Sequence, residues 1–434
     1  MIPAHQISRL ATIICIVGFV AMPLSWVPII STGGMVLEVP NVVSVLFLAI
    51  LPLAVLNSRR MWRINLTFGL MFLWSLVYAS AIIVHHTPQG FAYLWLQVMQ
   101  AAFGWTLALA IAHSDIRLSR AALWGIGSIA LALLASSLLT NVNLIAVFTD
   151  YLISGNRTRF IYQGMRTVFN AFTFQLSDFG YVASQINALA NTVALYAIMV
   201  FMNDGENGTS PVLKAVALFC LAVAFVLFSA SANLVIVFFL ICLGLRATTR
   251  APQFVRAIFP LLVVALMILA FGPVTEFLGG NLDADTDSRG ARLGQYNYAF
   301  GVISENLWGG IGYSEFGGFT VHNWALFSWA AAGYAAFMIV CLIYLVLMLS
   351  TVQYAAVIRK STDVILAVLL LMVIRTAVGG GGGIPTGSAI VASAVIVGLM
   401  ERHLRMARQP SPEPEPDHDP VAVPAPGKGY SVPA

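Results

Sequence analysis

Charged residues are scarce in this chain of 434 residues. Only 9% of them are Asp, Glu, Lys or Arg, whereas a soluble globular domain has about 25%. Hydrophobic residues make up 59% of the chain, which has too few charges to cover a soluble surface. The sequence therefore excludes a soluble globular protein, and its net charge of +4 does not indicate a nucleic-acid partner.

Cysteine is equally rare. The four cysteines (Cys15, Cys220, Cys242 and Cys341) all fall within apolar segments, where a thiol behaves as a small core residue. No His, Cys, Asp or Glu spacing matches a zinc or calcium motif, and no glycine-rich phosphate loop follows a strand. We therefore expect no disulfide framework, no bound metal and no cofactor.

Long apolar runs dominate instead. A helix needs roughly 20 apolar residues to cross a bilayer, and many runs of about that length are separated by short polar breaks. The sequence predicts an all-α, polytopic integral membrane helix bundle with about twelve transmembrane helices. The expected helices cover about 9–30, 36–56, 64–84, 91–113, 121–139, 180–201, 211–229, 232–246, 255–272, 322–349, 362–377 and 386–400.

Lys and Arg indicate the orientation, because positive charge gathers in cytoplasmic loops. With both termini cytoplasmic, most basic residues fall on the inner side. The inner ones include Arg59, Arg60, Arg63, Arg117, Arg120, Lys214, Arg246, Arg250, Arg256, Arg359, Lys360, Arg402, Arg405 and Arg408. The six basic residues expected on the outer side are all arginines: Arg157, Arg159, Arg166, Arg289, Arg292 and Arg375.

The chain divides into a membrane domain, residues 1–405, and a tail, residues 406–434. The tail is rich in Pro and charge, which predicts a disordered cytoplasmic segment. Two outer loops, about 140–179 and 273–321, are long for a polytopic protein, and we expect the second to be large and partly helical.

The outer arginines suggest a ligand that carries phosphate. A guanidinium group stays charged and donates paired hydrogen bonds, which suits a pyrophosphate. Two other interpretations stay open: these arginines pair with nearby acids such as Asp150, or they bind lipid head groups.

The second outer loop carries the pattern of a helix over about 288–304. Arg289, Arg292 and Tyr296 share one stripe of this helix. A glycine-rich turn follows, and His322 with Asn323 opens the next helix at the boundary between loop and hydrocarbon. An imidazole there is suited to act as a general base, and the alternative is an interfacial histidine that hydrogen-bonds a loop carbonyl.

Residues of this region resemble the signature of the bacterial O-antigen ligase and O-antigen polymerase family. The resemblance covers roughly residues 285–335 and includes "ENLWGGIGYSEF" and "HNWALFSWAAAG". The matching positions are Asn306, Leu307, Gly310, Gly312, His322, Asn323, Leu326 and Gly333. The sequence departs from the family where a Ser-Arg pair often begins an earlier helix, since Ser231, Ala232 and Asn233 stand there, and Trp308 and Gly309 occupy the usual Pro-Leu-x-Gly region.

The resemblance implies a glycosyltransferase of the bacterial inner membrane with a periplasmic active site. The donor would be a glycan linked to undecaprenyl diphosphate, and the acceptor a hydroxyl of another glycan or of lipid A core. His322 would be the base and Arg289 would hold the diphosphate. The other candidate substrate-binding residues are Arg292, Arg157, Arg159, Arg166, Arg375, Tyr296 and Asn323.

The missing Ser-Arg pair favours a polymerase of exopolysaccharide or O-antigen over a ligase. Membrane lipids and other polysaccharide-assembly proteins are further expected partners. A transporter or flippase for lipid-linked sugars is the alternative from another class, and it would carry charges within its spans.

Overall fold

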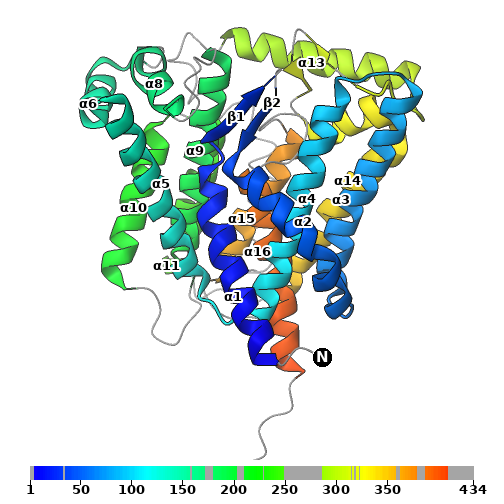
Figure 1. Cartoon of the computed structure of the whole chain (residues 1–434), viewed down its shortest axis with the longest axis horizontal. Helices are drawn as coiled ribbons and strands as arrows, with labels where there is room; N and C mark the ends of the chain where they lie inside the picture. The colour runs from blue at the N-terminus through cyan, green and yellow to red at the C-terminus, as the bar shows by residue number, and fades with distance from the viewer. Residues whose placement is uncertain are drawn as a thin grey trace, which may run out of the picture.

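The computed structural model describes residues 4–32, 35–156, 159–171, 179–202, 210–227, 229–248, 286–313, 315–316, 319–321, 323–357, 362–378 and 387–408. These residues form a helical bundle with two short antiparallel hairpins (Figure 1). The α-helices are α1 (Ala4–Ala21), α2 (Val39–Asn57), α3 (Trp62–Val84), α4 (Gly90–His113), α5 (Leu118–Thr140), α6 (Leu144–Ser154), α8 (Arg166–Phe169), α9 (Phe179–Met199), α10 (Pro211–Val226), α11 (Ala230–Thr248), α13 (Thr286–Glu305), α14 (Trp324–Val357), α15 (Thr362–Val378) and α16 (Gly387–Ala407).

The membrane class is confirmed. Seven of the described helices are long and apolar enough to cross a bilayer. A helix also lies at every predicted segment that the structure describes, and the segment 255–272 lies outside the described residues. The last helix is longer than expected because α16 continues to Ala407, and residues 409–434 are also outside the described part.

The first predicted helix, about 9–30, ends early. Helix α1 stops at Ala21 and a 3-10 turn, η1 (Met22–Leu24), follows, because Pro23 cannot continue the α-helical hydrogen bonding. The chain then forms strand β1 (Pro28–Thr32), which pairs with β2 (Met35–Glu38). The hairpin ends at Glu38, which directly precedes α2.

The first long loop contains more structure than the sequence predicted. Within about 140–179 the chain forms α6, a π-helical turn η2 (Phe160–Met165) and α8. In the second loop, α13 confirms the helix expected over about 288–304. Strands β3 (Glu315–Phe316) and β4 (Phe319–Thr320) form a small hairpin after it.

The two ends of the bundle carry different elements. Helices α6, α8 and α13 and the β1–β2 hairpin lie at one end, here called the outer end (Figure 1). The start of α1 and the end of α16 lie at the opposite, inner end. Both ends of the membrane domain therefore lie on the same side of the bundle.

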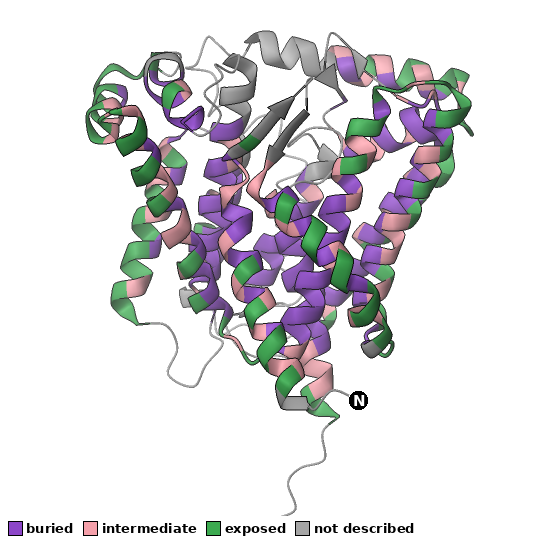
Figure 2. Ribbon diagram, viewed as in Figure 1, coloured by how far each residue is buried: buried purple, intermediate pink, exposed green. Residues whose placement is uncertain are grey.

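Burial divides the helices into central and peripheral ones. Helices α4 and α16 pack closely against each other and are buried over most of their length (Figure 2). The peripheral helices expose large apolar side chains, which is expected of a surface in contact with lipid. Examples are Leu46 and Leu53 on α2, Leu131 and Leu138 on α5, and Val212 and Phe219 on α10.

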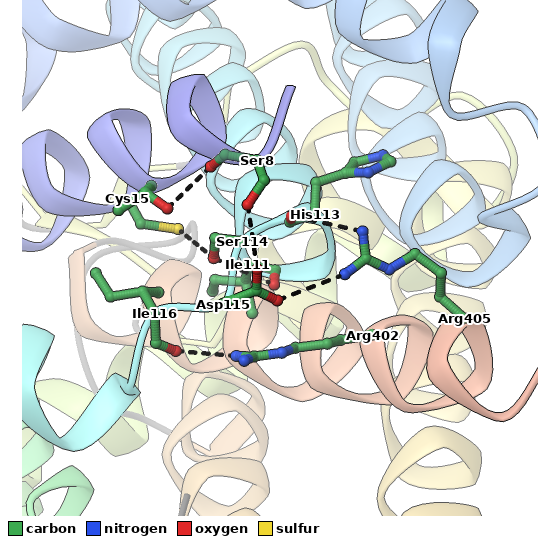
Figure 3. A network of polar contacts seen from close by, with 10 residues as sticks. Ser8, Cys15, Ile111, His113, Ser114, Asp115, Ile116, Arg402 and Arg405 are labelled. Carbon is green, nitrogen blue, oxygen red and sulfur yellow. Dashed lines mark hydrogen bonds and ion pairs between the residues drawn. The ribbon is translucent and has the colours of Figure 1, made fainter. Parts of the chain in front are cut away.

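Polar side chains hold the inner end together. Arg402 of α16 donates to the carbonyl of Ile116 at 2.9 Å, and Arg405 lies 4.0 Å from Asp115, so both arginines bind the link between α4 and α5 (Figure 3). Nearby, Arg63 of α3 lies 3.6 Å from the buried carboxylate of Glu401. These basic residues are thus part of the packing of α16.

Candidate functional site

Arg289 and His322 are the two residues that the resemblance singles out. His322 lies outside the described residues, as does Arg157. Arg289 and Arg292 lie in the first part of α13, at the outer end, and only their backbone is described. The roles proposed for these four residues stay predictions.

Arg159 and Arg166 belong to the segment from α6 to α8. Arg159 is exposed, and its Nε lies 3.4 Å from Oδ2 of Asp150, so the acid-pairing interpretation fits this arginine. Arg166 is half-buried, and its Nε has no hydrogen-bond acceptor among the described residues. The proposal that Arg159, Arg166 and Arg375 bind one ligand stays a prediction.

Arg375, one of the arginines expected on the outer side, is buried in the structure. It lies in the last turn of α15 and is only 7% exposed. Its Nη1 donates to Oδ1 of Asn191 on α9 at 2.5 Å, and its Nε has no acceptor among the described residues. Among the described residues no carboxylate pairs with Arg375, and the neutral amide of Asn191 accepts its hydrogen bond. A buried charge is costly without an anion beside it.

Asn191 is oriented for this contact. Its Nδ2 donates to the carbonyl of Asn187, one turn earlier in α9, at 2.7 Å. That bond uses the donor end of the amide and leaves the oxygen toward Arg375. The helix backbone therefore fixes the side chain that holds the guanidinium group.

A second polar contact joins the β1–β2 hairpin to α9. Glu38 is half-buried at the N-terminus of α2, and its Oε1 accepts a hydrogen bond from Nε2 of Gln185 at 3.1 Å. Burial raises the pKa of Glu38 to about 7, and the hydrogen bond from Gln185 acts in the opposite sense. Glu38 is therefore a carboxyl group that changes charge near neutral pH.

The helix that follows His322 is broken. The sequence predicted one continuous helix over 322–349, but Gly333 interrupts α14 with φ +79° and ψ −175°. The break divides α14 into a short half, 324–332, and a long half, 334–357. The prediction was wrong because hydropathy responds to apolar composition, which is the same on both sides of Gly333.

Contacts with α3 show that the short half points back into the bundle. The Trp324 ring lies 6.2 Å from that of Trp74, and the Phe327 ring lies 5.8 Å from that of Tyr78, closer to the end of α3. The short half thus runs in the same direction as α3. The long half runs the opposite way, since Gln353 accepts a hydrogen bond from Arg63 at the start of α3.

The short half is therefore re-entrant. The Trp324 ring lies 5.8 Å from the Tyr344 ring, although residues 20 apart in a straight helix are separated by about 30 Å. Val321 and Trp324 are buried on either side of residues 322 and 323. Trp324 lies opposite the middle of α3, so the short half begins deeper in the bundle than the outer end of α3.

The glycine-rich segment 306–312 fills the break. The amides of Ile311 and Gly312 donate to the carbonyls of Ala330 and Ala331 at 3.0 and 2.7 Å, and the amide of Tyr334 donates to the carbonyl of Leu307 at 3.1 Å. Backbone groups that a broken helix leaves free are thus satisfied by the loop, as a membrane interior requires.

Two of the remaining candidate residues have structural contacts. The side chain of Asn323 accepts a hydrogen bond from the amide of Leu326 at 3.0 Å and so caps the short half of α14. Tyr296 is half-buried and packs against the hydrophobic core from α13. Neither contact points to a bound substrate.

The sequence missed Glu38, Gln185 and Asn191. Gln185 and Asn191 lie inside α9, and polar residues inside an apolar helix are rare and tend to face the bundle interior, so these two could have been found. The sequence could not show which of them would meet Arg375.

These features define a polytopic α-helical membrane protein with a re-entrant half-helix and a buried arginine that has no carboxylate partner among the described residues. No protein-family model matches the chain, and no curated protein matches it in sequence.

Proposed function

We propose that this protein is a membrane glycan polymerase that uses a donor linked to undecaprenyl diphosphate. It would act from the periplasmic side of the bacterial inner membrane, with about twelve spans and both termini in the cytoplasm. The observation that carries the proposal is the buried guanidinium of Arg375, which lacks a carboxylate partner among the described residues. A lipid-linked diphosphate is an anion that reaches such a group from within the membrane.

The chemistry follows from the donor. In the proposed reaction His322 removes the proton of the acceptor hydroxyl, whose oxygen forms a bond to the anomeric carbon of the donor sugar. The bond between that carbon and the phosphate oxygen breaks, and the diphosphate leaves with the electron pair. Arg289, helped by Arg292 or Arg375, stabilises the departing anion.

The re-entrant half-helix supports this assignment of roles. Val321 and Trp324, which flank residues 322 and 323, are buried inside the bundle. A base in such a position is shielded from bulk water, which favours transfer to a sugar hydroxyl over hydrolysis.

Transport of a lipid-linked sugar is the second candidate function, and the same arginine favours it. Arg375 lies inside a helix of the bundle, and buried charges within spans are typical of transport pathways. A ligase that uses lipid A core as acceptor differs from the polymerase only in the second substrate.

Reconstitution separates these functions. Purified protein in liposomes receives donor repeat units linked to undecaprenyl diphosphate, alone or with lipid A core, and products are separated on a gel. A ladder from the donor alone is the expected result. Transfer only when lipid A core is present would indicate a ligase, and movement of intact donor between leaflets without transfer would indicate a transporter.

A further inference from the structure

We propose that segment 306–312 is a latch that holds the short half of α14 in its re-entrant position. Through that half-helix the latch would position the residues around His322. The consequence for activity rests on the proposed transferase function, whereas the mechanical role of the latch does not.

Backbone hydrogen bonds carry the first part of the proposal. Three main-chain bonds cross the joint, and the carbonyl of Leu307 also accepts a bond from Nε1 of Trp329 at 3.1 Å. Leu307 thus joins the two halves, since Trp329 lies before the break and Tyr334 lies after it. The carbonyl oxygen of Leu307 therefore accepts hydrogen bonds from both halves of α14.

Glycines make this close approach feasible. Gly310 has φ +66°, and a Cβ there would lie 2.5 Å from the carbonyl carbon of Ala331. Gly312 has φ +81° and lies against Thr87 and the carbonyl of Ala81 at the outer end of α3. These positions need both a left-handed backbone and the absence of a side chain.

Aromatic rings surround the joint. Trp329 stacks on Phe337 with ring centroids 4.5 Å apart, and Trp308 meets Tyr334 edge to face at 5.6 Å. Trp329 belongs to the short half of α14 and Trp308 to the latch, and each contacts a ring on the long half of α14. The rings therefore oppose straightening of the helix.

The position of the latch gives it a role in the reaction. It lies between α13, which carries Arg289 and Arg292, and the half-helix that follows His322. Asn306 continues the last turn of α13, because its amide donates to the carbonyl of Val302 at 2.9 Å. The seven residues of the latch thus follow directly on the helix proposed to hold the diphosphate and hydrogen-bond the half-helix that follows the proposed base. Trp329 and Leu307 are positioning residues in this account.

A cysteine pair tests the geometry without any substrate. Cys15, Cys220, Cys242 and Cys341 are first replaced by alanine in the full-length protein. Leu307→Cys with Tyr334→Cys should then form a disulfide under mild oxidation, because the backbones of these residues touch. The control pair, Leu307→Cys with Leu342→Cys, also uses two exposed positions but places the second about two turns further along the helix, and it should not cross-link.

Kinetics test the positioning. Trp329→Phe keeps an aromatic ring and removes only the indole donor. We expect kcat for transfer to fall about three- to tenfold, the effect of one lost hydrogen bond, with the KM for the donor unchanged. Oxidation of the Leu307–Tyr334 cysteine pair in the Trp329→Phe protein should restore kcat, and reduction should lower it again.

Each outcome has a separate meaning. Failure of the cysteine pair to cross-link, or equal cross-linking of the control pair, would overturn the latch. An unchanged kcat in Trp329→Phe, or a tether that abolishes transfer, would overturn its positioning role. If no variant transfers glycan, the wild type included, the proposed function fails, and the cross-linking result still decides whether the latch exists.

Discussion

Gly333 lies against the carbonyl oxygen of Trp308 so closely that a side-chain carbon at residue 333 would overlap it. The contact sits where α14 bends and the segment 306–312 enters the break. It brings together two glycine-containing stretches that are separated by more than twenty residues. Each needs the other's backbone at van der Waals distance.

Replacing Gly333 by alanine should therefore destabilise the protein. A residue with a Cβ at φ +79° costs about 1–3 kcal/mol, and the overlap with Trp308 adds to it. We expect a clear fall in the thermal unfolding midpoint, measured in detergent by intrinsic fluorescence. Gly301→Ala is the matched control, because Gly301 lies inside α13 with no atom within 4 Å of its added Cβ. An equal fall in both variants would contradict the role of the joint.

Arg375→Met should strongly reduce glycan transfer with little loss of stability. Removal of a buried charge that has no carboxylate partner among the described residues relieves its desolvation, which offsets the loss of the hydrogen bond to Asn191, so we expect the unfolding free energy to change by less than about 2 kcal/mol. Transfer rate and thermal midpoint are measured on the same preparation.

Arg120→Ala is the control for this experiment, since Arg120 is an exposed arginine near the start of α5 and is not among the candidate substrate-binding residues. Normal transfer by Arg375→Met would show that Arg375 does not bind the donor. A collapse of the stability of this variant would show that Arg375 has a structural role.

The pH dependence of stability should contain a contribution from Glu38. Its pKa is about 7 in the folded protein and lower in the unfolded chain, so the folded state binds the proton more tightly. Stability should fall by about 1–3 kcal/mol as the pH rises from roughly 4.5 to 7 and then level off.

Glu38→Gln keeps an acceptor for Gln185 and stays neutral. It should remove this slope and be more stable than the wild type at pH 8, as measured by thermal unfolding across pH. Glu305→Gln, at an exposed position, should retain the slope of the wild type. A slope that survives in Glu38→Gln would exclude this carboxyl group as its source.

The sequence predicts the helical membrane class and the helix over about 288–304, which the structure shows as α13, because apolar length and helical spacing are local properties. It does not reveal the break at Gly333, since one glycine within "AAAGYAA" leaves the hydropathy unchanged. Asn191 and Arg375 are 184 residues apart in the sequence, and no local pattern specifies the contact between them. The short helices α6 and α8 were missed because their polar surroundings resemble those of a loop.

His322→Ala in the liposome reconstitution tests the central claim most directly. His403→Ala is the matched control, since His403 lies on α16 at the inner end and contacts Tyr354. The account predicts that the wild type and His403→Ala convert donor repeat units into a ladder, whereas His322→Ala inserts normally and makes none. A ladder of normal intensity from His322→Ala would contradict the proposed mechanism.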